Sequence, residues 1–137
     1  MSIRADFPVF SHHPDLVYLD SASTAQKPSR VIEGMKYHME HGYANIHRGA
    51  YNLSEVSEDL YHGSKEAVVR LIHAHETAEI VYTYNATMAF NILATSLIAS
   101  HQLKKGDKVL LSRAEHHANI VPWLIAKQTI GIEVEFI

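Results

Sequence analysis

Apolar residues recur at two different spacings in the second half of the chain, and their alternation predicts a layered α/β fold. Short β-branched and aromatic runs bounded by turn residues favour strands, whereas apolar residues three and four positions apart favour helices. By these criteria we expect strands over 79–84, 108–111 and 132–137 and helices over 88–100 and 119–129. Strands that alternate with helices of this length indicate right-handed βαβ units and a parallel sheet.

The first half of the chain is predicted to be mainly helical. Pro28 suits a first helical turn, because its missing N–H would be unpaired there in any case. Asn52 followed by Glu55 resembles a capping box at the start of a second apolar-periodic segment. The pattern predicts a strand over 16–19, a polar turn over 20–24, helices over 28–41 and 52–73 and a loop over 42–52.

The expected sheet is incomplete. Its last strand stops with Ile137, and three or four strands of this kind are typical of part of a larger, mostly parallel sheet with flanking helices. No repeat or linker-like tract marks a boundary. We expect residues 1–24 to form an N-terminal arm with a first short strand and residues 25–137 to form the first part of a truncated α/β domain.

Composition excludes several classes of protein. The 137 residues are 47% hydrophobic and 20% charged, which is typical of a globular domain. A net charge of -3 argues against nucleic acid as the main partner, and the absence of cysteine excludes disulfides and thiolate chemistry. With neither a signal peptide nor a membrane span in the sequence, we expect a cytoplasmic protein.

Two loops at the carboxyl ends of expected strands are candidate sites, because ligands of open α/β sheets bind there. Asn85-Ala86-Thr87 precedes a helix, where free N–H groups and the Thr87 hydroxyl could hold a phosphate. The alternative, that Thr87 simply caps the helix, is the commoner case for such a segment. In the second loop, His116 and His117 could stack on a planar ligand, transfer protons or bind metal, or be ordinary exposed residues.

The eleven histidines are scattered rather than clustered. His73 and His75 do not share a helix face, and His38 with His41 lacks a third ligand. We therefore assign no metal ligands and take most of the histidines to be surface residues, with histidine-based metal binding kept as a third hypothesis only because there are eleven of them.

Five segments resemble one enzyme family in sequence and in order. They are Arg4–Val9, Tyr18–Ser21, Ala25–Ser29, His47–Gly49 and the nine residues Glu115–Trp123. Together they are similar to the N-terminal third of SUF-type (group II) cysteine desulfurases and selenocysteine lyases. These enzymes are class V aminotransferase-like proteins that use pyridoxal 5'-phosphate (PLP). The resemblance implies the N-terminal portion of the type I aminotransferase fold.

The resemblance also implies roles for particular residues. His116 matches the histidine that stacks on the PLP ring, and Thr87 matches a threonine that binds the cofactor phosphate. The family usually reads Gly-Thr-Thr-Glu where this chain reads Asn85-Ala86-Thr87-Met88, which predicts weaker phosphate binding. Asn can take a left-handed backbone almost as glycine can, but Ala86 lacks a hydroxyl and Met88 lacks a carboxylate that the family pattern has. The residues expected to contact cofactor are Asn85, Ala86, Thr87 and His116, and those near the substrate are Ala22, Ser23, His47 and Arg48.

The residues that complete the family reaction are absent from this chain. None of its seven lysines matches the lysine that links to PLP, and there is no cysteine to accept sulfur. The chain alone is therefore expected to bind PLP weakly or not at all and to lack activity. In the full-length enzyme, the resemblance implies cysteine or selenocysteine as substrate, a SUF-type sulfur-acceptor protein and a homodimer. The competing hypothesis is a non-catalytic binding or dimerisation module, or half of a split enzyme.

Overall fold

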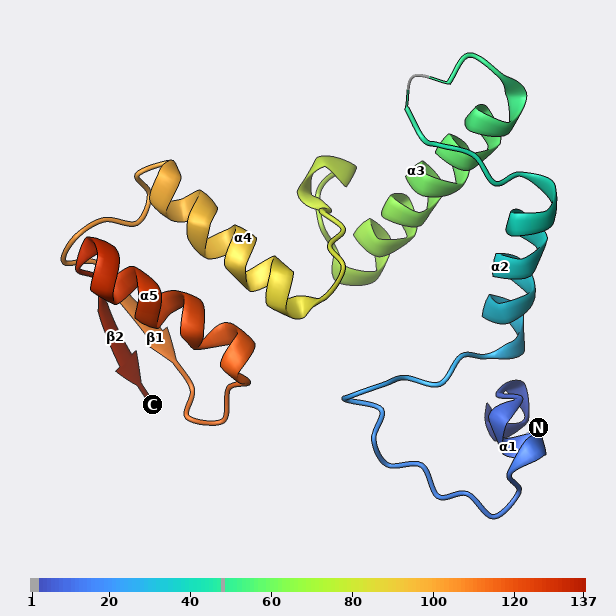
Figure 1. The fold of residues 1–137 in the computed structure, drawn as a ribbon, viewed down its shortest axis with the longest axis horizontal. Helices are drawn as coiled ribbons and strands as arrows, with labels where there is room; N and C mark the ends of the chain where they lie inside the picture. The colour runs from blue at the N-terminus through green and yellow to red at the C-terminus, as the bar shows by residue number, and fades with distance from the viewer. Residues whose placement is uncertain (1–2, 48) are drawn as a thin grey trace. The chain divides into compact units, whose positions relative to one another are not determined.

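The computed structural model describes residues 3–47 and 49–137, which fall into two compact units (Figure 1). The first unit covers Met1–Ile80 and the second covers Val81–Ile137. Each is described by itself below. The expected arm over residues 1–24 and the larger domain over 25–137 stay a prediction.

The first unit is helical within its described residues. It contains the 3-10 turns η1 (Ile3–Asp6) and η2 (Thr77–Glu79) and the helices α1 (Val9–His12), α2 (Ser29–His41) and α3 (Asn52–Ile72). Pro28 has an extended backbone immediately before α2, and His73 ends α3 in a left-handed conformation with φ of 56°. The two long helices expected from the sequence are therefore confirmed.

Two expected strands are wrong. Residues 16–19 and 79–84 have no strand structure, and within the described part of the chain only two other segments pair as a sheet. A strand needs a hydrogen-bonding neighbour, and neither segment has one here. Their apolar residues are exposed accordingly: Leu19 is 90% accessible and Tyr84 is 92% accessible.

The expected capping box at Asn52 is also wrong. Asn52 is already the first helical residue, and Tyr51 is the N-cap without a side-chain cap hydrogen bond. The carbonyl of Tyr51 accepts from the N–H of Ser54 at 3.0 Å. Entry into α3 is thus set by the loop before it, not by a local cap.

The second unit is a parallel βαβ arrangement preceded by a helix. It consists of α4 (Ala86–Ala99), β1 (Lys108–Leu111), η3 (His117–Asn119), α5 (Val121–Ile130) and β2 (Glu133–Phe136). β1 and β2 pair in parallel from Lys108 opposite Glu133 to Leu111 opposite Phe136. The helices expected over 88–100 and 119–129 and the strands expected over 108–111 and 132–137 are confirmed, with boundaries that differ by at most two residues.

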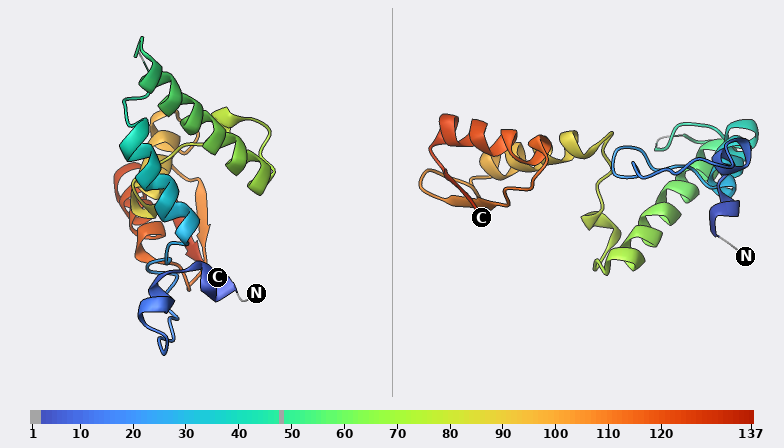
Figure 2. Two further views of the ribbon diagram at one scale, coloured as in Figure 1. Left: turned by 90° about the vertical axis from the view of Figure 1, so that its right-hand side faces the viewer. Right: turned by 90° about the horizontal axis from the view of Figure 1, so that it is seen from below.

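The core of the second unit lies between the helices and one face of the two-stranded sheet. Ala94 of α4, Leu111 of β1 and Trp123 of α5 form the buried cluster. Both helices lie on the same side of the strands (Figure 2). Leu110, which alternates with Leu111 along β1, is 56% exposed, so the opposite face of the sheet is uncovered.

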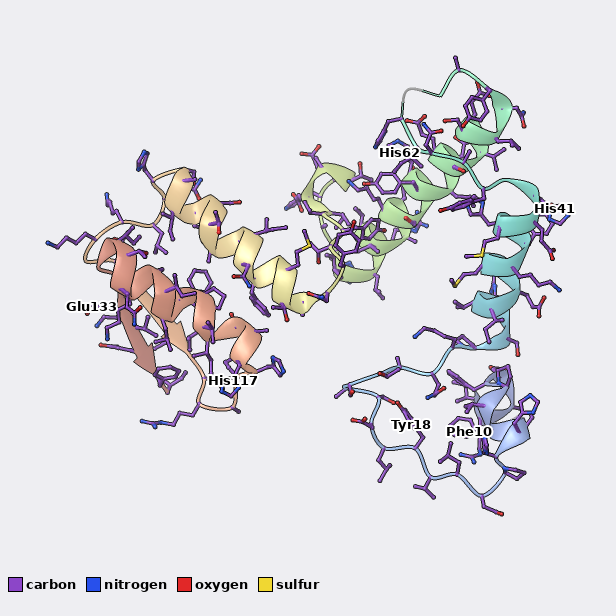
Figure 3. All side chains as sticks on the ribbon, viewed as in Figure 1. Phe10, Tyr18, His41, His62, His117 and Glu133 are labelled. Carbon is purple, nitrogen blue, oxygen red and sulfur yellow. The ribbon has the colours of Figure 1, made fainter. Side chains whose placement is uncertain are left out.

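The uncovered part of the sheet carries a charge pair across the strands. Lys108 Nζ donates to Glu135 Oε1 at 2.6 Å and lies 3.6 Å from Glu133 Oε2. The hydrogen bond to Glu135 raises the pKa of Lys108 above its ordinary value. Because these side chains are about half exposed, the interaction contributes little to the stability of the fold. Figure 3 shows Glu133 on β2.

Candidate functional site

The N-terminus of α4 is capped by Asn85. The side-chain oxygen of Asn85 accepts from the N–H of Met88 at 2.8 Å, and its carbonyl accepts from Ala89 at 3.1 Å. Asn85 has a φ of -166°, which is extended backbone. Asn85 therefore does not use the left-handed backbone open to it, and the alternative in which Thr87 caps the helix is wrong.

This cap leaves part of the helix terminus available for a ligand. The N–H groups of Ala86 and Thr87 precede the first intrahelical bond, and within the described residues neither has a partner. Thr87 is exposed, and its hydroxyl also lacks a partner among the residues described. Two amides, one hydroxyl and the positive end of the helix dipole form a chemically suitable environment for an anion.

The His116 loop connects β1 to α5 and is fixed at both ends. The N–H of Arg113 donates to the carbonyl of Ile137 at 2.9 Å, which ties the start of the loop to the end of β2. The N–H of Ala114 donates to Ser112 Oγ at 3.0 Å. At the other end, the buried Ala118 lies in η3. Hydrogen bonds and a buried residue therefore fix the conformation of the loop that carries the two histidines.

The His116 ring has a defined hydrogen-bonding role. Its Nδ1 accepts from the N–H of Ala118 at 3.1 Å, so the neutral ring carries its hydrogen on Nε2. The His117 ring lies 6.5 Å away at 88° and makes no such bond among the described residues. The two adjacent histidines are therefore not equivalent. Both are exposed, and His117 lies near the N-terminal end of α5 (Figure 3).

The two candidate loops of the second unit lie at one end of it. α4 contacts both η3 and α5, and the N-termini of α4 and α5 point the same way in Figure 1 and in the right-hand view of Figure 2. The segment Asn85–Thr87 and the loop of His116 are thus brought to the same end of this unit.

The substrate residues expected from the resemblance lie in the first unit. Ala22 and Ser23 occupy the turn after Asp20, where the N–H of Ser23 donates to the Asp20 carbonyl at 3.2 Å. This turn is confirmed, and both residues are exposed. Tyr18 closes the turn by donating its hydroxyl to the carbonyl of Thr24. Their role toward a substrate stays a prediction.

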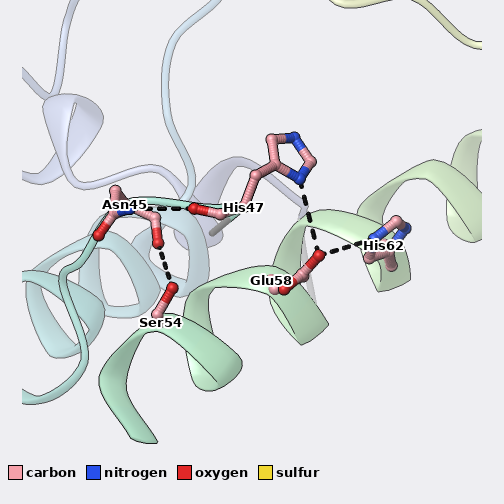
Figure 4. A network of polar contacts seen from close by, with 5 residues as sticks. All are labelled: Asn45, His47, Ser54, Glu58 and His62. Atoms are coloured by element: carbon pink, nitrogen blue, oxygen red, sulfur yellow. Dashed lines mark hydrogen bonds and ion pairs between the residues drawn. The ribbon is translucent and has the colours of Figure 1, made fainter. Parts of the chain in front are cut away.

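His47 belongs to a polar network between the α2–α3 loop and α3 (Figure 4). Its Nδ1 lies 3.6 Å from Glu58 Oε1, and His62 Nε2 lies 3.7 Å from the same oxygen. Its carbonyl accepts from Asn45 Nδ2 at 3.1 Å, and its φ is 66°. The expected substrate residue Arg48 lies outside the described residues.

Two buried serines of α3 hold this loop, and the sequence pattern did not identify them. Ser54 Oγ donates to the carbonyl of Asn45 at 2.7 Å, and Ser57 Oγ donates to the carbonyl of Gly42 at 2.8 Å. Their spacing of three on a helix was the available signal. A β-carbon at Gly49 would overlap Ser54, which explains why glycine follows His47 and Arg48.

The other histidines do not converge. No group of three or more potential metal ligands occurs in the described part of the chain. His41 stacks on Tyr37 at 4.2 Å and bonds to its carbonyl, whereas Nδ1 of His38 is buried without a partner among described residues. Nor, within that part, is any helix long and apolar enough to cross a membrane.

Comparison with known proteins places these observations in a family. The model of the class-V aminotransferases matches residues 17–137. A probable cysteine desulfurase from Synechocystis is 41% identical over 99% of this chain and 33% of its own length. A cysteine desulfurase from Yersinia pestis is 40% identical over 96% of this chain and 33% of its own length. The chain therefore spans about a third of the length of these curated relatives.

Solved structures agree with the sequence matches. The apo cysteine desulfurase from Thermococcus onnurineus aligns with a TM-score of 0.87 and 32% identity over 98% of this chain and 32% of its own. A cysteine desulfurase from Escherichia coli in an S-sulfonic acid form aligns with a TM-score of 0.76 and 36% identity, over 97% of this chain and 33% of its own.

Proposed function

Because the chain belongs to the class-V aminotransferase family, we propose that it forms the N-terminal portion of a SUF-type cysteine desulfurase. The complete enzyme would convert L-cysteine to L-alanine and transfer the sulfur as an enzyme persulfide for iron–sulfur cluster assembly. The observation that most directly supports this proposal is the 41% identity, over 99% of this chain, to a probable cysteine desulfurase. The resemblance of the sequence motifs and the expected fold class are confirmed at the level of family and fold.

The family depends on PLP, and the geometry of the second unit suits part of that cofactor. The free N–H groups of Ala86 and Thr87 and the Thr87 hydroxyl would hold its phosphate. The exposed ring of His116, held through Nδ1, would stack on its pyridine ring. Bound PLP supplies an electron sink for chemistry at the substrate Cα. In the complete enzyme, the residues of this chain would help to bind and orient the cofactor.

This chain supplies too few contacts to hold PLP tightly. Hydrogen bonds to a charged phosphate and ring stacking contribute roughly 1 to 3 kcal/mol each, and because association itself costs free energy, their sum supports only about millimolar affinity. Asn85 uses the N–H of Met88 for its own cap, and Ala86 lacks a hydroxyl, so the phosphate site is weaker than the family pattern implies. A covalent lysine and a sulfur-accepting cysteine from the remainder of the enzyme would complete it. Cysteine or selenocysteine as substrate, a SUF-type sulfur acceptor and a homodimer belong to the same proposal.

A chimera provides the test. The chain would replace the matching first third of the Synechocystis relative, and alanine release from cysteine would be measured after PLP loading. We expect activity well above that of a control protein lacking its first third. A folded, PLP-loaded chimera that releases no alanine would refute the proposal.

The second candidate is a split enzyme, and the exposed apolar residues favour it. Leu19, Leu71 and Tyr84 are each at least 78% exposed, which is unusual for a chain that functions alone. Adding the remaining two thirds of the relative in trans should then restore alanine release. A monomeric chain that does not associate with that part would exclude this candidate.

A further inference from the structure

Two side chains of the His116 loop and one of α5 form a continuous hydrogen-bonded series. Asn119 Nδ2 donates to Glu115 Oε2 at 3.1 Å, and Trp123 Nε1 donates to Asn119 Oδ1 at 3.0 Å. The residues are four apart, so the series runs from the loop into the first turn of α5. Both polar atoms of the Asn119 amide are engaged, which fixes its orientation.

The far end of this series is anchored in the core. Trp123 is only 6% exposed and packs with Ala94 and Leu111. Its indole N–H finds a partner in Asn119, as buried tryptophans usually require. Glu115 and Asn119 are half-buried, so their hydrogen bond is less exposed to competition from water than a surface pair.

His116 lies inside the span that this series bridges. Its carbonyl accepts from the backbone N–H of Asn119 at 2.8 Å, and its ring Nδ1 accepts from Ala118 at 3.1 Å. Glu115, the residue immediately before it, is held by the Asn119 side chain. Asn119 therefore constrains both the backbone of His116 and the residue that precedes it.

We propose that Asn119, through Glu115 and Trp123, is a positioning residue that fixes the orientation and tautomer of the His116 ring. The Ala118 N–H can reach Nδ1 only while the backbone over 115–119 keeps this turn. The ring then presents an exposed face and an Nε2–H donor. That the face receives PLP rests on the proposed function, whereas the constraint on the ring does not.

The direct readout is the tautomer of the His116 ring, which a purely stabilising role would not alter in a folded variant. Ring 15N shifts of the full chain, labelled at histidine, report which nitrogen carries the hydrogen. Solid-state NMR also permits a self-associated sample, and His116→Gln assigns the signals. Measured where the ring is neutral, the unchanged chain should show the hydrogen on Nε2.

Three variants and one control test the hydrogen bond between Asn119 and Glu115. Asn119→Asp keeps an oxygen for Trp123 but loses the donor to Glu115 and places two carboxylates together. Glu115→Gln keeps an acceptor for Asn119, and Glu115→Ala removes it. Asn91→Asp is the matched control, since Asn91 donates instead to the carbonyl of Thr87 in α4 at 2.8 Å.

We expect Asn119→Asp and Glu115→Ala to lower the ratio of Nε2–H to Nδ1–H tautomer roughly five-fold, the equivalent of one net hydrogen bond. Glu115→Gln and Asn91→Asp should leave it unchanged. Unaltered His116 shifts in Asn119→Asp with native helical content would overturn the proposal. Should that variant fail to fold, Glu115→Ala decides in the same way. A chimera that binds no PLP would contradict the proposed function but leave this result intact.

Discussion

Replacing Gly49 by alanine is expected to destabilise the loop between α2 and α3. The added β-carbon would overlap both Oγ and Cβ of Ser54. Ser54 is fully buried, and its hydroxyl is bonded to the carbonyl of Asn45. Ser54 cannot turn away without losing that bond, so either the loop moves or the bond breaks.

The cost follows from these two contributions. Overpacking of a tight site costs typically about 1 to 3 kcal/mol, and loss of one net hydrogen bond costs about 1 kcal/mol. The expected loss is therefore roughly 2 to 4 kcal/mol, a large share of the stability of a small domain.

Urea unfolding followed by far-UV circular dichroism measures this loss. The control is Gly63→Ala in the interior of α3, where no atom lies within 4 Å of the added β-carbon. There the better helix propensity of alanine should stabilise by about 0.5 to 1 kcal/mol. The same substitution should thus have opposite signs at the two glycines. An unchanged urea midpoint for Gly49→Ala would refute the reasoning.

Three further predictions concern the second unit and its site. In the chimera, His116→Ala should remove most of the alanine-releasing activity, and His117→Ala should remove much less of it, because only the His116 ring is fixed through Nδ1. Equal losses of alanine release in the two variants would contradict this. Thr87→Ala should raise the dissociation constant of PLP, and Ala86→Thr, which adds a hydroxyl, should lower it. If fluorescence titration gave both variants the dissociation constant of the unchanged chimera, the assignment of the phosphate site would be contradicted. The isolated chain should form oligomers or bind the dye ANS through the uncovered sheet, whereas a compact, dye-negative monomer by light scattering would count against it.

Local signals in the sequence predicted most of the fold. Pro28 and the apolar periodicity were sufficient for α2 and α3. The strands expected over 108–111 and 132–137 formed as β1 and β2, and each follows a glycine with positive φ, Gly106 and Gly131. Residues 16–19 and 79–84 failed because β propensity says nothing about whether a neighbouring strand is present to pair with them.

The site was predictable in its residue types but not in its connections. The loop of His116 could be found as a loop that follows a strand. The helix terminus at Thr87 could be found from the helix predicted over 88–100, although the strand expected before it, over 79–84, is absent. Which residue caps α4 depends on whether Asn85 or Thr87 has the extended backbone, and two polar residues on either side of Ala86 do not reveal this. The bonds among Glu115, Asn119 and Trp123 became apparent only once η3 and α5 were in place.

The structure of the PLP-loaded chimera tests the central claim most directly. It should show the cofactor phosphate on the N–H groups of Ala86 and Thr87, with the His116 ring stacked on the pyridine ring and its Nδ1 still bonded to Ala118. A phosphate bound away from the N-terminus of α4, or a His116 ring turned away from the cofactor, would contradict the account.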